Sequence, residues 1–245
     1  MNIFSVWTAL GILAGLVTLA QRAVINQRTR AITHGVSVLV WGLAGSRLVH
    51  AALNWEYYRN HLIEIPQVWL GGLAWEGMLA GVCLGWIILA YSSRFSLGYL
   101  LDELYPLLPP LAVCSWLGCW MVGTAYGMAL PEGTWWGISA RDESGEFARR
   151  FPLQPLAAFT LAAYFWFIDS HRPRRAPAGL LGGLALAGFA LGMAGFTSLR
   201  ADYAPAWQGL RIETWVAAVF AGIFMGFTLL IWFFRKRTPK RLYKP

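Results

Sequence analysis

Charged residues are scarce in this chain of 245 residues. Only 13% of the residues are Asp, Glu, Lys or Arg, whereas 57% are hydrophobic. A soluble domain carries about a quarter charged residues, so this composition excludes an ordinary soluble globular protein. Basic residues outnumber acidic ones by 20 to 12. They form no RNA- or DNA-binding pattern, and we therefore expect no nucleic-acid partner.

Cysteine is scarce as well. Cys83, Cys114 and Cys119 all lie within apolar runs, and none belongs to a C-x-x-C pair. This arrangement excludes a disulfide framework and a zinc site. The sequence predicts no bound metal and no cofactor.

Long apolar runs dominate what is present. Runs of about 17 to 25 residues are long enough to cross the hydrocarbon core of a bilayer. The first lacks a preceding basic residue and a cleavage site, so we expect it to stay in the mature protein. The sequence predicts a single all-α integral membrane domain over residues 1–245, with about seven transmembrane helices. The runs are 3–20, 33–53, 67–91, 97–127, 154–169, 177–199 and 212–234.

The fourth run is too long for one straight helix. Pro106, Pro109 and Pro110 interrupt it, so we expect a broken or re-entrant segment packed within the protein. The connections between runs indicate the orientation. Alternate connections, together with the C-terminal tail, contain 13 basic residues against six in the other set. The positive-inside rule then places the N-terminus outside and the C-terminus in the cytoplasm.

Ionisable residues inside apolar runs are candidate site residues, because their burial in a membrane is costly. Glu76, in the third run, could act as an acid or base, or could be a hydrogen-bonded residue that holds a loop. Arg47, in the second run, could reach the interface or bind phosphate. Asp102 could cap a helix, and Glu103 is expected to be solvated. Arg200, close to Arg211 in sequence, could join Arg47 in holding an anionic head group, or could be an interfacial anchor.

Five segments together resemble the prolipoprotein diacylglyceryl transferase family. The most specific is DELYPLLPPLAVCSWLGCWMVGTAYG, which matches a family stretch without a gap and keeps the Asp-to-Pro spacing and two glycines. The other segments are GSRLVH beside the family's Gly-x-Arg, WLGGLAWEGMLAG beside its Gly-Gly-Met-Ser-Phe-His-Gly-Gly, RFPLQPLAAF beside its His-Pro-x-Gln, and SLRADYAP beside its late arginine.

The resemblance implies a fold and an activity. Members of the family are seven-span bacterial inner-membrane proteins that transfer diacylglyceryl from phosphatidylglycerol to the lipobox cysteine thiol of a preprolipoprotein. The partners implied are thus phospholipid, preprolipoprotein and the bacterial cytoplasmic membrane. Glu76 would be the base and Arg200 a phosphate ligand, both in catalytic positions. The implied substrate-binding positions are Arg47, Asp102, Gly118, Cys119, Gly127 and Gln154.

Several family residues are replaced in this chain. Glu76 and Phe151 stand where the family has histidine, and Trp116 stands where it has an arginine. Cys119 and Thr124 stand for an asparagine and a glutamate. Because Trp116 cannot donate a guanidinium fork, three hypotheses stay open. They are a divergent transferase for this or a related lipid and acceptor, a non-catalytic lipid-binding or complex-forming relative, and, less favoured, a transporter.

Overall fold

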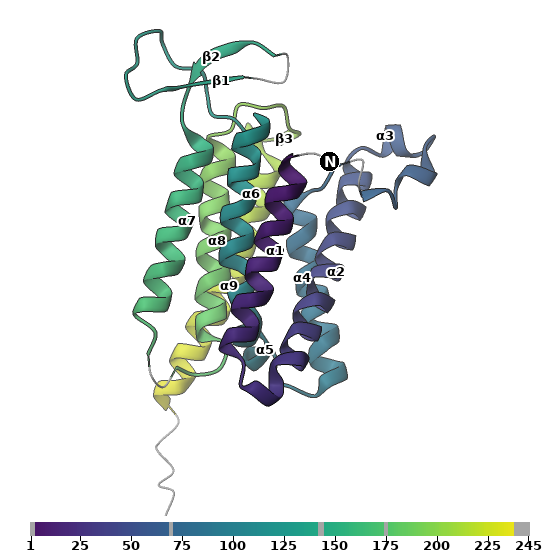
Figure 1. Cartoon of the computed structure of the whole chain (residues 1–245), viewed down its shortest axis with the longest axis vertical. Helices are drawn as coiled ribbons and strands as arrows, with labels where there is room; N and C mark the ends of the chain where they lie inside the picture. Colours follow the sequence, from purple (N-terminus) through teal and green to yellow (C-terminus); the bar gives the residue numbers. More distant parts are fainter. Residues whose placement is uncertain (1–2, 69–70, 142–144, 174–175, 238–245) are drawn as a thin grey trace, which may run out of the picture.

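The computed structural model describes residues 3–68, 71–141, 145–173 and 176–237, and most of them are helical (Figure 1). Each apolar run that the sequence predicts coincides with a helix or a broken helix. A short helix, α3, and two 3-10 turns, η1 and η2, lie between the long helices. The bounds are α1 (Ile3–Arg22), η1 (Ile25–Gln27), α2 (Arg28–Leu53), α3 (Trp55–Tyr58), η2 (Leu62–Glu64), α4 (Trp75–Ser93), α7 (Leu153–Ser170), α8 (Leu180–Ser198) and α9 (Ile212–Arg237).

The fourth run is interrupted, as its prolines predict. It consists of α5 (Leu97–Leu104), a 3-10 turn η4 (Tyr105–Leu107) and α6 (Leu108–Val122). Pro106 lies in the turn, while Pro109 lies in the first turn of α6, where a backbone N–H has no intrahelical partner. Helix α6 is followed by Gly123, whose φ of 78° is unfavourable for residues with a side chain.

The third helix begins later than the apolar run predicts. The run starts at residue 67, but α4 starts at Trp75. Gly71 and Gly72 have φ values of 89° and 73°, and this left-handed backbone cannot continue a helix. Residues 69 and 70 lie outside the described part of the chain.

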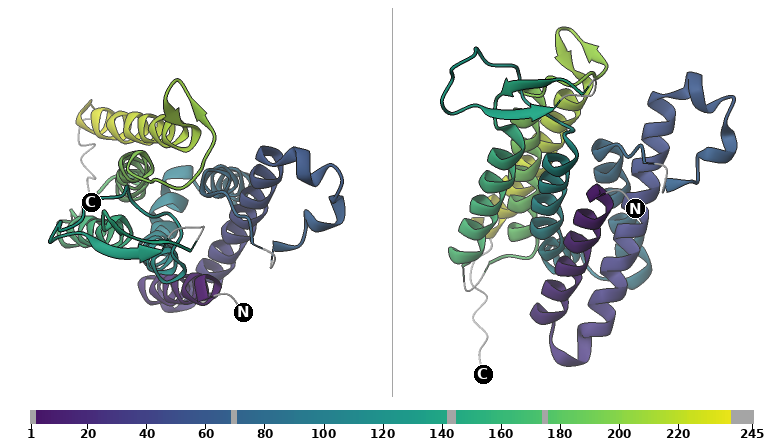
Figure 2. Two further views of the ribbon diagram at one scale, coloured as in Figure 1. Left: turned by 90° about the horizontal axis from the view of Figure 1, so that it is seen from above. Right: turned by 45° about the horizontal axis from the view of Figure 1, so that its top comes forward.

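The long helices run side by side in one bundle, and successive helices alternate in direction (Figures 1 and 2). The most extensive pairings are α2 with α4, α8 with α9, and α1 with α6. A core of buried apolar residues joins α6, α7 and α8 and includes Trp116, Leu161 and Phe189. We call the end of the bundle that carries the strands the hairpin end, and the opposite end the α5 end.

Glycines allow the closest helix contacts. A Cβ atom added to Gly45 of α2 would lie 2.8 Å from the Cα atom of Gly81 in α4. One added to Gly11 of α1 would lie 3.0 Å from the Cα atom of Leu111 in α6. Small residues at these positions let the backbones approach, which is the usual packing device of membrane helices.

Two small antiparallel sheets, which the sequence analysis did not predict, lie at the hairpin end. Strands β1 (Ile138–Arg141) and β2 (Phe147–Arg150) pair with Ile138 opposite Arg150. Strands β3 (Ala206–Trp207) and β4 (Leu210–Arg211) form a tighter hairpin before α9. Strands this short carry too few residues for a periodic pattern to be recognised.

Six helical segments of the described chain are long and apolar enough to cross a membrane. Helix α7 has 18 residues and is not among them, although it lies beside α6 and α8. The protein is therefore a multi-pass membrane protein by length and composition. The six segments are Ile3–Arg22, Ile25–Leu53, Trp75–Ser93, Leu97–Val122, Leu180–Ser198 and Ile212–Phe233.

Candidate functional site

Glu76 is a buried carboxylate at the hairpin end. It lies in the first turn of α4 and is 8% exposed. Its Oε2 atom is buried and has no hydrogen-bond partner among the described residues. The charges of Glu213 and Arg200 both act on it. The first turn of a helix favours a carboxylate there, because its unpaired N–H groups create a positive potential.

Four charged side chains form a network at the hairpin end, and the charges of two of them act on Glu76. Arg200, directly after α8, donates from Nε to Asp202 Oδ1 at 2.9 Å and from Nη1 to Glu213 Oε2 at 2.9 Å. Arg211 of β4 donates from Nη1 to the backbone carbonyl of Asp202 at 2.6 Å, and its Nη2 lies 3.4 Å from Asp202 Oδ2. Carboxylates of this chain thus hold the guanidinium of Arg200, whereas Nε and Nη2 of Arg211 are buried without a hydrogen-bond partner among the described residues.

The network keeps Arg200 charged. Burial by itself would lower the pKa of its guanidinium, but the hydrogen bond to Asp202 and the charge of Glu213 raise the pKa overall. Arg200 is therefore a permanent cation near Glu76. Of the cluster of Arg47, Arg200 and Arg211 that the sequence analysis considered, the structure brings Arg200 and Arg211 together.

The segment after α6 connects this network to three further predicted residues. Gly127 pairs with Arg200 as an antiparallel bridge, and the N–H of Ala201 donates to the carbonyl of Tyr126 at 2.9 Å. A Cβ atom on Gly127 would lie 2.9 Å from the Cβ atom of Phe151, so a side chain there would push the two segments apart.

Cys119 and Gln154 lie at the same end. The charges of Arg200 and Asp202 act on the Cys119 thiol. Gln154, 1% exposed at the start of α7, donates from Nε2 to the carbonyl of Thr124 at 3.0 Å, and its Oε1 atom has no partner among the described residues. Gln154 also lines a cavity of about 270 Å³ that lies between the end of α6 and β1. Glu76 lines neither this cavity nor the one at the α5 end.

Aromatic residues pack where the family pattern has cations. Trp116 is 6% exposed, and its ring meets the edge of Phe196 with centroids 5.6 Å apart. Phe151 packs against Trp136 with centroids 5.9 Å apart. These two positions therefore contribute apolar contacts and no positive charge.

Three of the predicted site residues make their contacts away from the network around Arg200. Gly118 faces α1, because a Cβ atom on it would lie 3.1 Å from the Cβ atom of Trp7. Asp102 caps α8, accepting from the backbone N–H of Gly179 at 2.7 Å and of Gly182 at 2.8 Å. These contacts place Gly118 in a helix–helix interface and Asp102 at the α5 end.

The third is Arg47, which is 3% exposed and holds the loop between α2 and α4. Its Nε atom donates to a backbone carbonyl at 2.7 Å, and its Nη2 atom to another at 2.6 Å. The four carbonyl acceptors belong to Glu64, Ile65, Gly71 and Gly72. All these hydrogen bonds go to the loop, and none goes to the network around Arg200.

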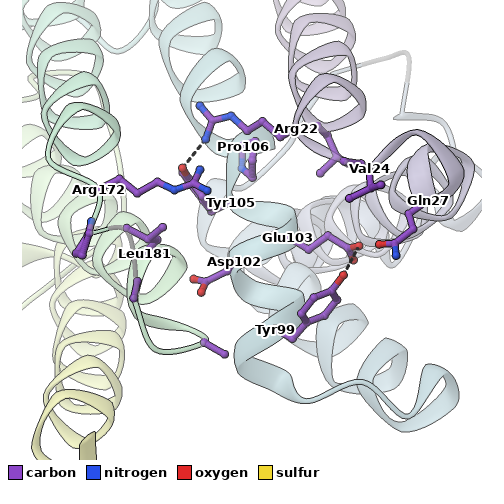
Figure 3. A pocket seen from close by; sticks show the side chains of 15 residues that line it. Arg22, Val24, Gln27, Tyr99, Asp102, Glu103, Tyr105, Pro106, Arg172 and Leu181 are labelled. Atoms are coloured by element: carbon purple, nitrogen blue, oxygen red, sulfur yellow. Dashed lines mark hydrogen bonds between the residues drawn. The ribbon is translucent and has the colours of Figure 1, made fainter. Parts of the chain in front are cut away.

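A larger cavity of about 640 Å³ opens at the α5 end (Figure 3). Arg22 donates to the hydroxyl of Tyr105 and to Asp169 on one side of it. On the other side, Glu103 lies 2.8 Å from the ring of His34 and its side chain is 10% exposed. The expectation that Glu103 is solvated was therefore wrong, because His34 of α2 covers it.

Sequence reasoning missed two carboxylates and one arginine of the hairpin end. Asp202 gave no signal of its own, since a carboxylate beside an arginine in a polar loop looks solvated. Glu213 is the second residue of the seventh apolar run, and that position could have indicated it. Arg150 is 8% exposed and lies over the ring of Tyr126 at 4.4 Å from its centroid. Its position directly before the RFPLQP segment could have indicated it.

The fold and the buried polar groups define a class: a multi-pass helical membrane protein with a cluster of buried ionisable residues at one end of its helix bundle. The model of the prolipoprotein diacylglyceryl transferase family matches residues 1–238. The chain belongs to that family, and its members are transferases.

Curated relatives agree with this assignment at low identity. A phosphatidylglycerol–prolipoprotein diacylglyceryl transferase of Streptococcus sanguinis is 24% identical over 245 residues, which is 95% of this chain and 93% of the relative. A protein of the same name from Frankia alni is 24% identical and covers 89% of this chain and 60% of its own length. One from Listeria monocytogenes is 30% identical over 89 residues, 35% of this chain and 31% of the relative.

Proposed function

We propose that this protein transfers a diacylglyceryl group from a glycerophospholipid to the cysteine thiol of a lipobox-containing preprolipoprotein. Family membership and the names of the relatives support a transfer of this kind, with phosphatidylglycerol as the first donor to test. The observation that carries the proposal is the buried Oε2 atom of Glu76, which has no hydrogen-bond partner in the described part of the chain and on which the charge of Arg200 acts. A buried polar atom without a partner is costly unless a ligand completes it.

We further propose that α7 is a seventh span and that the hairpin end faces outward from the bacterial cytoplasmic membrane. The 13 to 6 distribution of basic residues supports this orientation. Helix α7 lies alongside α8 in Figure 1 and runs antiparallel to it, which supports the span.

In the proposed reaction, the acceptor sulfur attacks the glyceryl carbon that bears the phosphate. The carboxylate of Glu76 accepts the thiol proton, since a thiolate is the better nucleophile. A C–S bond forms and the C–O bond breaks, and the leaving phosphate keeps the bonding electron pair. Arg200, held by Asp202 and Glu213, supplies positive charge as the phosphate gains its second negative charge.

The test is transfer of labelled diacylglycerol from phospholipid vesicles to a lipobox peptide by the purified protein. Glu76→Gln keeps the shape but removes the proton acceptor, so turnover should fall by about a hundredfold or more while lipid binding persists. Glu132→Gln, an exposed glutamate at the same end, is the matched control and should have full activity. Transfer by an active relative in the same detergent but none by this protein with any donor would reject the proposal.

A second candidate function is a non-catalytic lipid-binding or complex-forming relative. The packing of Trp116 and Phe151 favours it, because both positions lose the cations of the family pattern. Under this hypothesis lipid co-purifies with the protein, no transfer occurs, and Glu76→Gln changes binding or assembly alone.

A further inference from the structure

The cavity of about 270 Å³ at the hairpin end has a buried hydrogen-bond acceptor in its wall. Gln154 lines this cavity and is 1% exposed. Its Nε2 atom donates to the carbonyl of Thr124, whereas its Oε1 atom has no hydrogen-bond partner among the described residues. A buried acceptor of this kind is costly unless a donor completes it. The cavity therefore suits a ligand that carries an N–H or O–H group.

Strand β1 forms another wall of this cavity and presents an edge to it. Ser139, Ala140 and Arg141 all line the cavity. Side chains of consecutive strand residues point to opposite faces of a sheet, so a cavity that touches three consecutive residues meets the edge of the strand. A Cβ atom on Gly123, directly after α6, would lie 3.4 Å from the carbonyl oxygen of Arg141. This carbonyl therefore lies toward the end of α6.

The hydrogen bonds of β2 show which backbone groups of β1 are free. The carbonyl of Arg149 accepts from the N–H of Leu130 at 2.7 Å, on the edge of β2 that faces away from β1. Opposite residues of an antiparallel pair alternate between those that exchange hydrogen bonds and those that do not. Arg149 therefore makes no such bonds with Ser139, nor Phe147 with Arg141. The N–H and C=O groups of Ser139 and Arg141 thus point away from β2, toward the edge that lines the cavity.

An extended peptide has the hydrogen-bonding groups that this edge needs. Its N–H and C=O groups recur every second residue along one edge, which matches the spacing from Ser139 to Arg141. Both residues are exposed, and no further strand pairs with β1 in the part of the chain that the structure describes. A peptide can therefore add to β1 as the next strand, and main-chain hydrogen bonds give such complexes their affinity. An N–H group of the same peptide can complete Oε1 of Gln154.

A short series of contacts connects the cavity to the charged network. Gln154 donates to the carbonyl of Thr124, and the N–H of Thr124 donates to the carbonyl of Cys119 at 3.0 Å. The charges of Arg200 and Asp202 act on the thiol of Cys119. A peptide bound along β1 would thus lie close to the residues to which we assign the transfer chemistry.

We propose that the open edge of β1 and the Oε1 atom of Gln154 form the docking site of the acceptor polypeptide, which binds there as an extended strand. The inference rests on the proposed function for the identity of the polypeptide, whereas docking is measurable without transfer. Residues that flank the lipobox cysteine pair with Ser139 and Arg141, and this pairing holds the cysteine on the side of Arg200.

Backbone methylation of the peptide tests this pairing with the unmodified protein. The probe is a fluorescent lipobox peptide in which alanine replaces the cysteine, so that no transfer occurs. Methylation of one backbone nitrogen at a time should weaken binding about tenfold or more at two positions separated by one residue, because each loses a hydrogen bond to β1. Methylation of the residue between them should change binding little. Equal effects at consecutive positions, or no binding of the unmethylated peptide, would overturn the proposal.

Variants of the protein locate the docking site. Ser139→Pro removes an N–H group from the open edge and leaves the hydrogen bonds to β2 in place, whereas Ser139→Ala keeps that N–H group and is the matched control. Affinity for the peptide should fall about tenfold or more in Ser139→Pro and stay within about twofold in Ser139→Ala. Equal affinities of the two variants would refute docking at this edge. Should Ser139→Pro fail to fold, the methylation series still decides.

The role of Gln154 has a separate variant. Gln154→Leu removes the acceptor from the cavity wall, so affinity for the peptide should fall about twofold to tenfold. Unchanged affinity would refute the part of Gln154 in docking.

Transfer assays separate this inference from the proposed function. Transfer to a lipobox peptide with an unchanged KM in Ser139→Pro would refute docking at β1 and leave the transferase function standing. Peptide binding that shows the alternating methylation pattern, without transfer from any phospholipid, would refute the transferase function and support the docking site.

Discussion

Arg47→Ala should release the loop between α2 and α4. The guanidinium is 3% exposed and donates to four backbone carbonyls of that loop. Alanine removes the donor of these carbonyls, which belong to half-buried and exposed residues of the loop. The loop should then open, because open backbone can hydrogen-bond to water.

The magnitude follows from the number of bonds. A hydrogen bond to a charged group contributes about 1.5 to 3 kcal/mol, and the four are not additive because one opening exposes them together. We expect a loss of about 3 to 5 kcal/mol, the usual cost of removing one partner of a buried charged contact. Each 1.36 kcal/mol is tenfold, so opening of the loop should increase by about a hundredfold to several thousandfold.

Hydrogen exchange measured by mass spectrometry in detergent checks this prediction. Amides of residues 59–68 should exchange much faster in Arg47→Ala, while those of α8 and α9 should not change. Arg59→Ala is the matched control, since its ion pair with Glu56 is exposed and contributes at most about 0.5 kcal/mol. Loop exchange identical in Arg47→Ala and the unmodified protein would refute the structural role of Arg47.

Three further predictions concern stability, measured as the free energy of unfolding in detergent. Asp102→Ala should lower the free energy of unfolding by about 1 to 2 kcal/mol, because it removes the cap of α8, and Asp102→Asn should lower it less. Equal losses for the two variants would contradict the capping role. Gly45→Ala should destabilise the protein clearly, because the added Cβ atom meets the backbone of α4. Gly222 has open space around it, so Gly222→Ala should change the free energy of unfolding by about 1 kcal/mol or less. Similar effects of the two variants would refute the close helix contact. Arg200→Ala should cost about 3 to 5 kcal/mol, and adding Glu213→Gln should restore part of it; no restoration would contradict the ion pair.

The helices and the break in the fourth apolar run could be predicted from the sequence, because crossing a membrane requires long apolar segments and a proline inside a helix removes a backbone hydrogen bond. Family membership could be predicted too, since the segments from Asp102 to Gly127 keep a recognisable spacing. The position of Glu76 in an apolar run already marked it as costly, and its buried Oε2 atom, which has no hydrogen-bond partner among the residues that the structure describes, agrees with that reasoning.

The partners of the charged residues were decided by the tertiary structure alone. Asp102 caps a helix whose first N–H groups lie 77 residues further along the chain, and Gly127 pairs with Arg200 through a bridge between distant segments. Arg47 was compatible with phosphate binding until the fold placed four carbonyl groups around it. A sequence shows which residues need a partner, because that need follows from charge and burial. Which partner they find depends on which helices lie side by side, and glycine contacts such as that of Gly45 with α4 allow that approach only after the chain has folded.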